Sequence, residues 1–126
     1  MGNRAVIAFK DQDCGIYLHW NGGRASVEAF LRSGSELVRH DDDCYMPARL
    51  AQIIGNWLGG NLSLGVGPLK GLDCDNGDNG VYYVDSAFKI TGRKFAPHIE
   101  EANAEKTEKI YRECMAVNRP IFEKTK

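Results

Sequence analysis

The chain has 126 residues, of which 43% are hydrophobic and 26% are charged, and this composition is typical of one folded domain rather than of a disordered chain. The formal net charge is −1, which argues against a sequence-independent grip on a nucleic-acid polymer, because such binding requires a strongly basic face. No apolar run is long enough to span a membrane, so we expect no membrane partner.

The first elements expected along the chain are two strands that pair as a hairpin. Arg4–Phe9 is a short apolar run, and Ile16–Trp20 follows it after a turn. A break at Asn21-Gly22-Gly23 then leads into a helix from Arg24 or Ala25 to about Arg32, in which apolar residues recur at helical spacing. Gly34 is predicted to end or kink this helix.

The second helix has the clearest pattern in the chain. It begins near Pro47, after a polar loop at His40–Asp43, and Gly59-Gly60 ends it as a left-handed C-terminal cap would. Its apolar stripe falls at positions i, i+3, i+4, i+7 and i+8, namely Leu50, Ile53, Ile54, Trp57 and Leu58. We expect this helix to lie in the core.

Three further strands are expected in the second half of the chain. A strand with alternating residues from Leu62 to Val66 ends at Gly67-Pro68, because proline cannot extend a central ladder. A polar loop at Asp73–Gly80 leads into a hairpin that turns at Asp85-Ser86-Ala87. The two strands of this hairpin are predicted at Val81–Val84 and Phe88–Thr91.

A last helix is predicted from Pro97 to about Val117, and its narrow apolar stripe is typical of a helix that packs on a partner subunit or lies along the surface. Together the elements predict a single α+β domain over residues 1–126, with about five strands and three helices in the order ββααβββα. Because hairpins join most successive strands, the sheet should be largely antiparallel, with the helices on one face and one helix at the C-terminus.

The four cysteines are far apart in the sequence, at Cys14, Cys44, Cys74 and Cys114. This spacing is not that of a disulfide framework or of a paired-cysteine zinc site, so we expect reduced and mostly buried thiols. Because the N-terminus also lacks the long apolar region of a signal peptide, the sequence predicts a cytoplasmic protein, and nothing in it calls for a cofactor.

The stretch Tyr17–Arg24 carries the first candidate binding feature. A strand that passes into a helix through Asn21, Gly22 and Gly23 leaves backbone N–H groups at the positive end of the helix dipole, where a phosphate can bind. Arg24 stands at the same point, and its guanidinium could bind the same anion. The alternative is that the two glycines only form a tight turn and that Trp20 belongs to the core.

The sequence gives less support to a catalytic or metal site than to an anion-binding site. Neither register of an EF-hand calcium loop places the required ligands within the acidic loop, and the histidines have no second ligand at a diagnostic spacing. No nucleophile motif or phosphate-loop lysine occurs. We therefore predict no catalytic residue and no metal ligand. A metal-dependent phosphodiesterase that uses His19 with Asp73 or Asp75 stays as an alternative.

A second glycine-flanked arginine, Arg93, and a second anion-friendly turn beginning at Asn76 complete a nucleotide-binding pattern. Arginine suits a phosphate, asparagine suits a base or ribose edge, and an aromatic ring can stack on a base. The alternative for Arg93 is a surface arginine after a turn. The rings available for stacking are Trp20, Trp57, Tyr82 and Tyr83.

Several of these segments together resemble a family of small phage and prophage proteins. The resemblance runs along residues 3–93 and rests on Asn3–Ile7, Tyr17–Arg24, Asp73–Tyr82 and Ile90–Arg93. The family is similar to the Thoeris anti-defence proteins of phages, which bind cyclic ADP-ribose isomers and withhold this signal from a host effector without cleaving it. Sites of that kind use arginines, an asparagine and a stacking aromatic, and they lie where subunits meet.

The resemblance implies a homodimer or higher homo-oligomer in the host cytoplasm that sequesters a small cyclic nucleotide and is not an enzyme. Trp57, Tyr82 and Tyr83 compete for the stacking role. The ligand-binding residues predicted are Asn21, Gly22, Gly23, Arg24, Asn76, Tyr82 and Arg93. The other alternative is a phage inhibitor that binds a host protein directly through the exposed face of the last helix.

Overall fold

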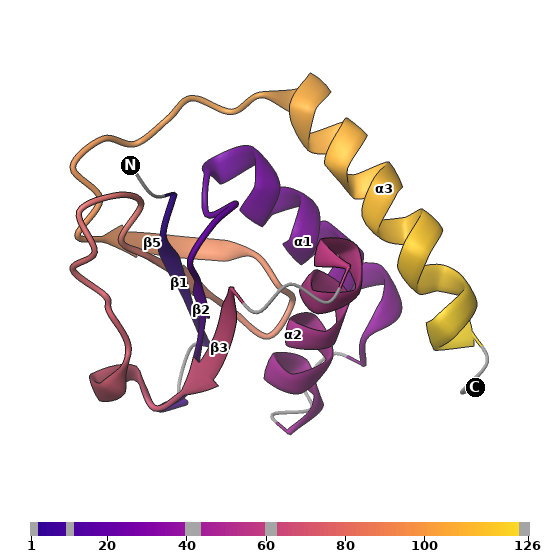
Figure 1. The fold of residues 1–126 in the computed structure, drawn as a ribbon, viewed down its shortest axis with the longest axis horizontal. Coiled ribbons are helices and arrows are strands. Elements are labelled where there is room, and N and C mark those ends of the chain that lie inside the picture. Colours follow the sequence, from indigo (N-terminus) through magenta and orange to yellow (C-terminus); the bar gives the residue numbers. More distant parts are fainter. Residues whose placement is uncertain (1–2, 10–11, 40–43, 60–62, 124–126) are drawn as a thin grey trace.

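The computed structural model describes residues 3–9, 12–39, 44–59 and 63–123. In these residues, five strands, three α-helices and one short 3-10 helix follow one another in the predicted order (Figure 1). Their bounds are β1 Ala5–Phe9, β2 Gly15–Leu18, α1 Arg24–Leu37, α2 Tyr45–Leu58, β3 Leu64–Gly67, η1 Leu69–Gly71, β4 Val81–Val84, β5 Ile90–Lys94 and α3 Ala104–Glu123.

The strands form one sheet in the order β3-β2-β1-β4-β5. Neighbouring strands are antiparallel except at the centre, where β1 and β4 run parallel with Ile7 opposite Tyr82. The parallel pair arises because the chain forms α1, α2 and β3 before β4 returns beside β1. Figure 1 shows the three helices on one side of the sheet. The predicted α+β fold with a largely antiparallel sheet is therefore confirmed.

The two faces of the sheet are buried by different parts of the chain. Alternate residues of β1 point to opposite faces, so Ile7 joins the main core under the helices and Val6 joins a smaller cluster on the other side. Leu69 and Leu72, in and after η1, cover that second cluster. All of β1 is consequently buried, which explains why its sequence is continuously apolar.

Gly34 does not end α1, which continues to Leu37, so the predicted end of the helix near Arg32 is wrong. A Cβ atom on Gly34 would lie 3.1 Å from two ring carbons of Phe88 and 3.3 Å from Leu50, so the glycine serves close packing. Phe88 itself has a left-handed backbone (φ 60°) in the turn between β4 and β5. That conformation is incompatible with a strand, and β5 therefore begins at Ile90 rather than at Phe88.

The second helix matches its prediction. Buried residues of α2 include Leu50, Ile53 and Ile54, and Gly59 caps the helix with a left-handed backbone (φ 73°). The predicted loop at His40–Asp43 lies outside the described residues, as do Gly60 and Leu62.

The last helix begins and ends later than predicted. Pro97 precedes it by several residues, and α3 starts at Ala104, where the Asn103 side chain accepts a hydrogen bond from the backbone N–H of Lys106 at 3.0 Å. The helix continues beyond Val117 to Glu123 with Pro120 inside it. Residues 95–103, expected to be helical in part, connect β5 to α3 without regular secondary structure (Figure 1).

One face of α3 is buried against α1 and α2 of the same chain, so the helix is more than a surface or partner-facing element. Its buried Asn118 donates to the backbone carbonyls of Ile53 at 3.1 Å and Cys114 at 2.9 Å, and it accepts from the Asn56 side chain at 2.8 Å. A buried amide with all of these partners fixes how α3 sits on α2.

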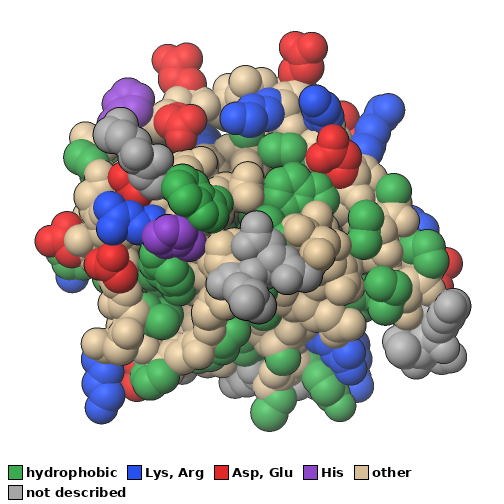
Figure 2. All heavy atoms as spheres, in the orientation of Figure 1, with side chains coloured by type: hydrophobic (Ala, Val, Ile, Leu, Met, Phe, Trp, Pro, Cys, Tyr) green, Lys and Arg blue, Asp and Glu red, His purple; other side chains and the backbone are tan. Residues whose placement is uncertain are grey.

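The surface mixes charges of both signs. On the face shown in Figure 2, acidic and basic side chains are interspersed rather than gathered by sign. Trp20 is 45% exposed, so it does not belong to the core. The four cysteines are free; Cys114 is buried but Cys44 is exposed, so the prediction of mostly buried thiols is only partly right. Within the described ranges, no helix is both long and apolar enough to cross a membrane.

Candidate functional site

Arg24 is positioned by the turn between β2 and α1. Asn21 has a left-handed backbone (φ 62°), and a Cβ atom on Gly22 would lie only 2.5 Å from the carbonyl oxygen of Asn3. Gly23 is the N-cap of α1 and brings no side-chain cap, and Arg24 is the first residue of the helix. The predicted passage from strand to helix is confirmed, and it puts Arg24 at the positive end of the α1 dipole.

Arg93 reaches the same region from β5. It stands opposite Tyr82 in the β4–β5 ladder, and its guanidinium carbon lies 3.7 Å from the centre of the Tyr82 ring. The Arg93 Nη2 donates to the carbonyl oxygen of Asn79 at 2.7 Å, whereas its Nε is buried with no hydrogen-bond partner in the described residues. The guanidinium is thus held in place while part of its donor capacity is unused.

Tyr82 links these two halves of the site. Its side chain is fully buried, and its hydroxyl donates to the carbonyl oxygen of Gly22 at 2.8 Å. Burial raises the pKa of Tyr82 to about 12. The face of the Tyr82 ring therefore contacts Arg93, and its hydroxyl is hydrogen-bonded to the turn that precedes Arg24.

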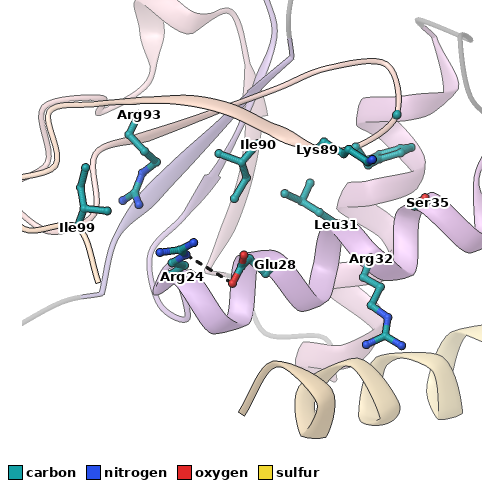
Figure 3. A pocket seen from close by; sticks show the side chains of 11 residues that line it. Arg24, Glu28, Leu31, Arg32, Ser35, Lys89, Ile90, Arg93 and Ile99 are labelled. Atoms are coloured by element: carbon teal, nitrogen blue, oxygen red, sulfur yellow. Dashed lines mark ion pairs between the residues drawn. The ribbon is translucent and has the colours of Figure 1, made fainter. Parts of the chain in front are cut away.

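Arg24 and Arg93 line one cavity of about 530 Å³ between α1 and the β4–β5 hairpin. Figure 3 shows both arginines at the same end of this cavity, with Ile99 beside Arg93. Asn21, Gly22 and Gly23 shape the turn next to the cavity without lining it. The other lining residues are Glu28, Leu31, Arg32, Ser35, Ala87, Phe88, Lys89, Ile90 and Ile99.

Positive charge predominates in the cavity. The single lining carboxylate, that of Glu28, lies 3.6 Å from Nε of Arg24, and the lining cations are Arg24, Arg32, Lys89 and Arg93. Arg32 contributes least, because its guanidinium points toward α3 and lies 3.2 Å from the carboxylate of Glu108 (Figure 3). The end that holds Arg24 and Arg93 is therefore the end that would attract an anion.

Asn76 is placed apart from the cavity. Its side-chain oxygen accepts from the backbone N–H groups of Asp78 and Gly80, each at 3.0 Å, and its nitrogen donates to two loop carbonyls. These bonds use the whole amide to build the loop. The neighbouring Asn79 is the residue that contributes to the site, through its carbonyl bond to Arg93.

The three aromatic rings predicted to compete for stacking do not line the cavity either. Tyr82 lies beneath Arg93, and Tyr83 packs on the opposite face of the sheet. Trp57 packs on Phe30 in the helical core, with ring centres 5.3 Å apart. The aromatic side chain that does line the cavity is Phe88, in the turn that the sequence analysis assigned to a strand.

The acidic loop is tied to the N-terminal segment by ion pairs. The Arg4 guanidinium lies 2.9 Å from Asp78 and 3.5 Å from Asp73, and its hydrogen bond lowers the pKa of the Asp78 carboxyl. His19 Nδ1 is 2.9 Å from the Tyr17 hydroxyl. Within the described ranges, no group of three or more His, Cys, Asp or Glu side chains could hold a metal ion.

Some site residues carried a usable sequence signal and others did not. Glu28 is four residues after Arg24 on a predicted helix, a spacing at which opposite charges meet. Lys89 and Ile99 lie in a hairpin turn and an irregular segment whose positions follow from tertiary packing alone. Comparisons with protein-family models, with curated proteins and with solved structures found no match to this chain. The cavity and its side chains are therefore what supports a function.

Proposed function

We propose that the cavity between α1 and β5 binds a small phosphorylated ligand, and that the protein sequesters a cyclic nucleotide signal, a cyclic ADP-ribose isomer, without cleaving it. The observation that carries the proposal is the convergence of Arg24 and Arg93 on one cavity of about 530 Å³. A cavity of this size lies within the usual range for small-molecule sites, about 300 to 1,000 Å³.

The charged end of the cavity suits a pyrophosphate. Two guanidinium groups can each offer paired donors to phosphate oxygens, and such charge-assisted bonds are about twice as strong as neutral ones. The first turn of α1 contains no acidic residue, so its backbone N–H groups and dipole add to the attraction. The proposed contacts are Arg24 and Arg93 on the phosphates.

The rest of the lining suits the less polar part of a nucleotide. The apolar side chains of Leu31, Ile90 and Ile99 line the cavity together with the Phe88 ring. Tyr82 is buried beneath Arg93 and cannot stack on the base, so the aromatic ring that this chain offers to the cavity is Phe88. In the sponge proteins that the resemblance points to, the site lies where subunits meet. We therefore propose a homodimer or higher homo-oligomer, which native mass spectrometry would count directly.

The lining favours binding over catalysis. Among the described residues, the lining contains no histidine or cysteine, and its one carboxylate, Glu28, lies beside Arg24 rather than free to act as a general base. Sequestration then works by mass action, so the protein must be abundant and its affinity must exceed that of the effector.

The experiment is a thermal-shift and calorimetric titration with cyclic ADP-ribose isomers, followed by heating to denature the protein and analysis of the released ligand. Ligand at a hundred times its dissociation constant should stabilise the fold by about 2.7 kcal/mol, which for 126 residues is a rise of about 10 °C in Tm. Intact ligand after heating is the expected result. A converted product, or no binding by any isomer, would contradict the proposal.

One observation favours a second candidate, an inhibitor that binds a host protein directly. The outer face of α3 exposes Val117 and Ile121, at 41% and 40%, next to Pro120. If this candidate is right, Arg24→Ala and Arg93→Ala leave the anti-defence activity intact, while Val117→Glu and Ile121→Glu abolish it. The sponge proposal predicts the opposite pattern.

A further inference from the structure

Residues 96–102, which we call the strap, run past the end of the cavity that holds the two arginines. They connect β5 to α3 without helix or strand (Figure 1), and Ile99 contributes to the cavity lining beside Arg93 (Figure 3). The strap side chains are mostly exposed, and Ile99 itself is 58% exposed. The strap therefore borders the arginine end of the cavity through Ile99 without being built into the core.

Glu100 is the point at which the strap is fastened to the body of the protein. The Arg24 Nη1 donates to the Glu100 carbonyl oxygen at 2.6 Å, and the backbone N–H of Arg24 donates to the Glu100 carboxylate at 3.5 Å. In the described residues, these are the hydrogen bonds that join the strap to another element, and both end on Arg24. Release of Glu100 would therefore release the strap.

The Glu100 carboxylate also lies where an anion is most favourable. Gly23, the N-cap of α1, has no side chain to cap the helix, and the Glu100 Oε1 would be 3.5 Å from a Cβ atom placed on Gly23. The strap thus brings a negative charge to the start of α1 from a residue remote in sequence. Because Glu100 is exposed and its carboxylate is 3.5 Å from the backbone nitrogen of Arg24, the carboxylate is held weakly enough to be displaced from the helix.

We propose that Glu100 is an internal competitor of the ligand phosphate, and that ligand binding displaces Glu100 from Arg24 and frees the strap; this inference rests on the proposed function of the cavity. A phosphate bound to Arg24 at the start of α1 would stand next to the Glu100 carboxylate, and like charges repel. A phosphate group that carries more than one negative charge competes for the start of α1 better than the single carboxylate does, and it offers the Arg24 guanidinium a charged acceptor in place of the Glu100 backbone carbonyl. Glu100 thereby limits the affinity of the site for a phosphorylated ligand.

The test compares Glu100→Gln with Glu101→Gln, a neighbouring exposed glutamate, in the full-length protein. Inorganic pyrophosphate is titrated by calorimetry, and backbone order parameters of residues 98–102 are measured by ¹⁵N relaxation. We expect Glu100→Gln to bind pyrophosphate about fivefold more tightly and Glu101→Gln to stay within about twofold of wild type. The order parameters of the strap should fall from about 0.85 toward 0.6 or less in wild type with pyrophosphate, whereas ligand-free Glu100→Gln should keep the wild-type values, because the bond from Arg24 Nη1 to the backbone carbonyl of residue 100 remains.

The outcomes separate the two proposals. If Arg24→Ala loses pyrophosphate while Glu100→Gln and Glu101→Gln both match wild type in affinity, and pyrophosphate leaves the strap order parameters of wild type unchanged, the strap inference is overturned and the proposed site stands. If wild type and Glu100→Gln both fail to bind pyrophosphate, the proposed site is overturned, and the competition with it. Binding by Glu100→Gln with none detected in wild type supports both.

Discussion

The hydroxyl group of Tyr82 provides the sharpest test of how the site is assembled. It is fully buried and donates to the carbonyl oxygen of Gly22, which is itself buried. Tyr82→Phe removes this donor and keeps the ring on which Arg93 lies. We therefore expect a loss of stability that is much larger than any change in the position of Arg93.

The expected loss of stability follows from the carbonyl oxygen of Gly22, which Tyr82→Phe leaves without its donor. A buried acceptor left without a partner costs about 1 to 3 kcal/mol, so we expect Tyr82→Phe to lower the free energy of unfolding by about 2 kcal/mol. For a chain of 126 residues this corresponds to a fall of about 8 °C in Tm.

The stability of the two proteins should also depend differently on pH. The pKa of Tyr82 is raised from 10.0 to about 12, chiefly by burial, so above pH 10 the unfolded chain loses the proton while the folded chain keeps it. Wild type then loses stability as pH rises from 10 to 12, by up to about 1.4 kcal/mol per pH unit, whereas Tyr82→Phe has no such term. The stability difference between the two proteins should consequently shrink over this range.

Urea unfolding at pH 8 and at pH 11 measures both effects, with Tyr83→Phe on the opposite face of the sheet as the matched control. We expect Tyr83→Phe to stay within about 0.5 kcal/mol of wild type at pH 8. A stability of Tyr82→Phe equal to that of wild type, or a difference that does not narrow at pH 11, would refute the role assigned to the hydroxyl.

Three further predictions concern other parts of the fold. Asn118→Asp should destabilise the protein by more than about 3 kcal/mol, because it places a carboxylate against two backbone carbonyls that now accept from the amide; urea unfolding measures it, and a loss below about 1 kcal/mol would contradict the buried role. Thiol labelling should modify Cys44 in the folded protein and Cys114 only on unfolding, since burial raises the pKa of Cys114 to about 12; equal labelling rates would show that the helices do not cover Cys114. Pro120→Ala should raise the free energy of unfolding by about 1 kcal/mol, and Tm with it, because alanine restores a donor to the Ala116 carbonyl within α3. A fall in Tm would indicate that the proline ring makes packing contacts that alanine loses.

The elements of the fold could be predicted where a local pattern dictates them. The apolar stripe of α2 and its glycine cap, and the short apolar runs of β1 and β4, are properties of short segments. Gly34 was misassigned because a glycine near the end of a helical pattern predicts helix termination. Its actual role is close packing against Phe88, which lies in a hairpin far along the chain. Pro97 was misassigned for a related reason, since a proline can open a helix without being required to.

The site was predictable in part for the same physical reason. Arg24 and Arg93 were recognisable because each follows a glycine in the sequence, and the fold brings them to one cavity. Asn76 had the same kind of local signal, but its amide is used within its own loop. The fastening of Glu100 to Arg24 has no local signal, because it depends on where the strap passes in the folded protein.

The most direct test of the account is a calorimetric titration of ADP-ribose into wild type, Arg24→Ala and Arg93→Ala, with Arg49→Ala as the control. Arg49 is a half-buried arginine on α2 that does not line the cavity. Each of the first two substitutions should weaken binding at least about tenfold, which corresponds to about 1.4 kcal/mol per lost charged contact, and Arg49→Ala should change it by less than about twofold. Binding of wild-type strength in Arg24→Ala or in Arg93→Ala, or equal losses in all three variants, would contradict the claim that Arg24 and Arg93 hold one phosphorylated ligand.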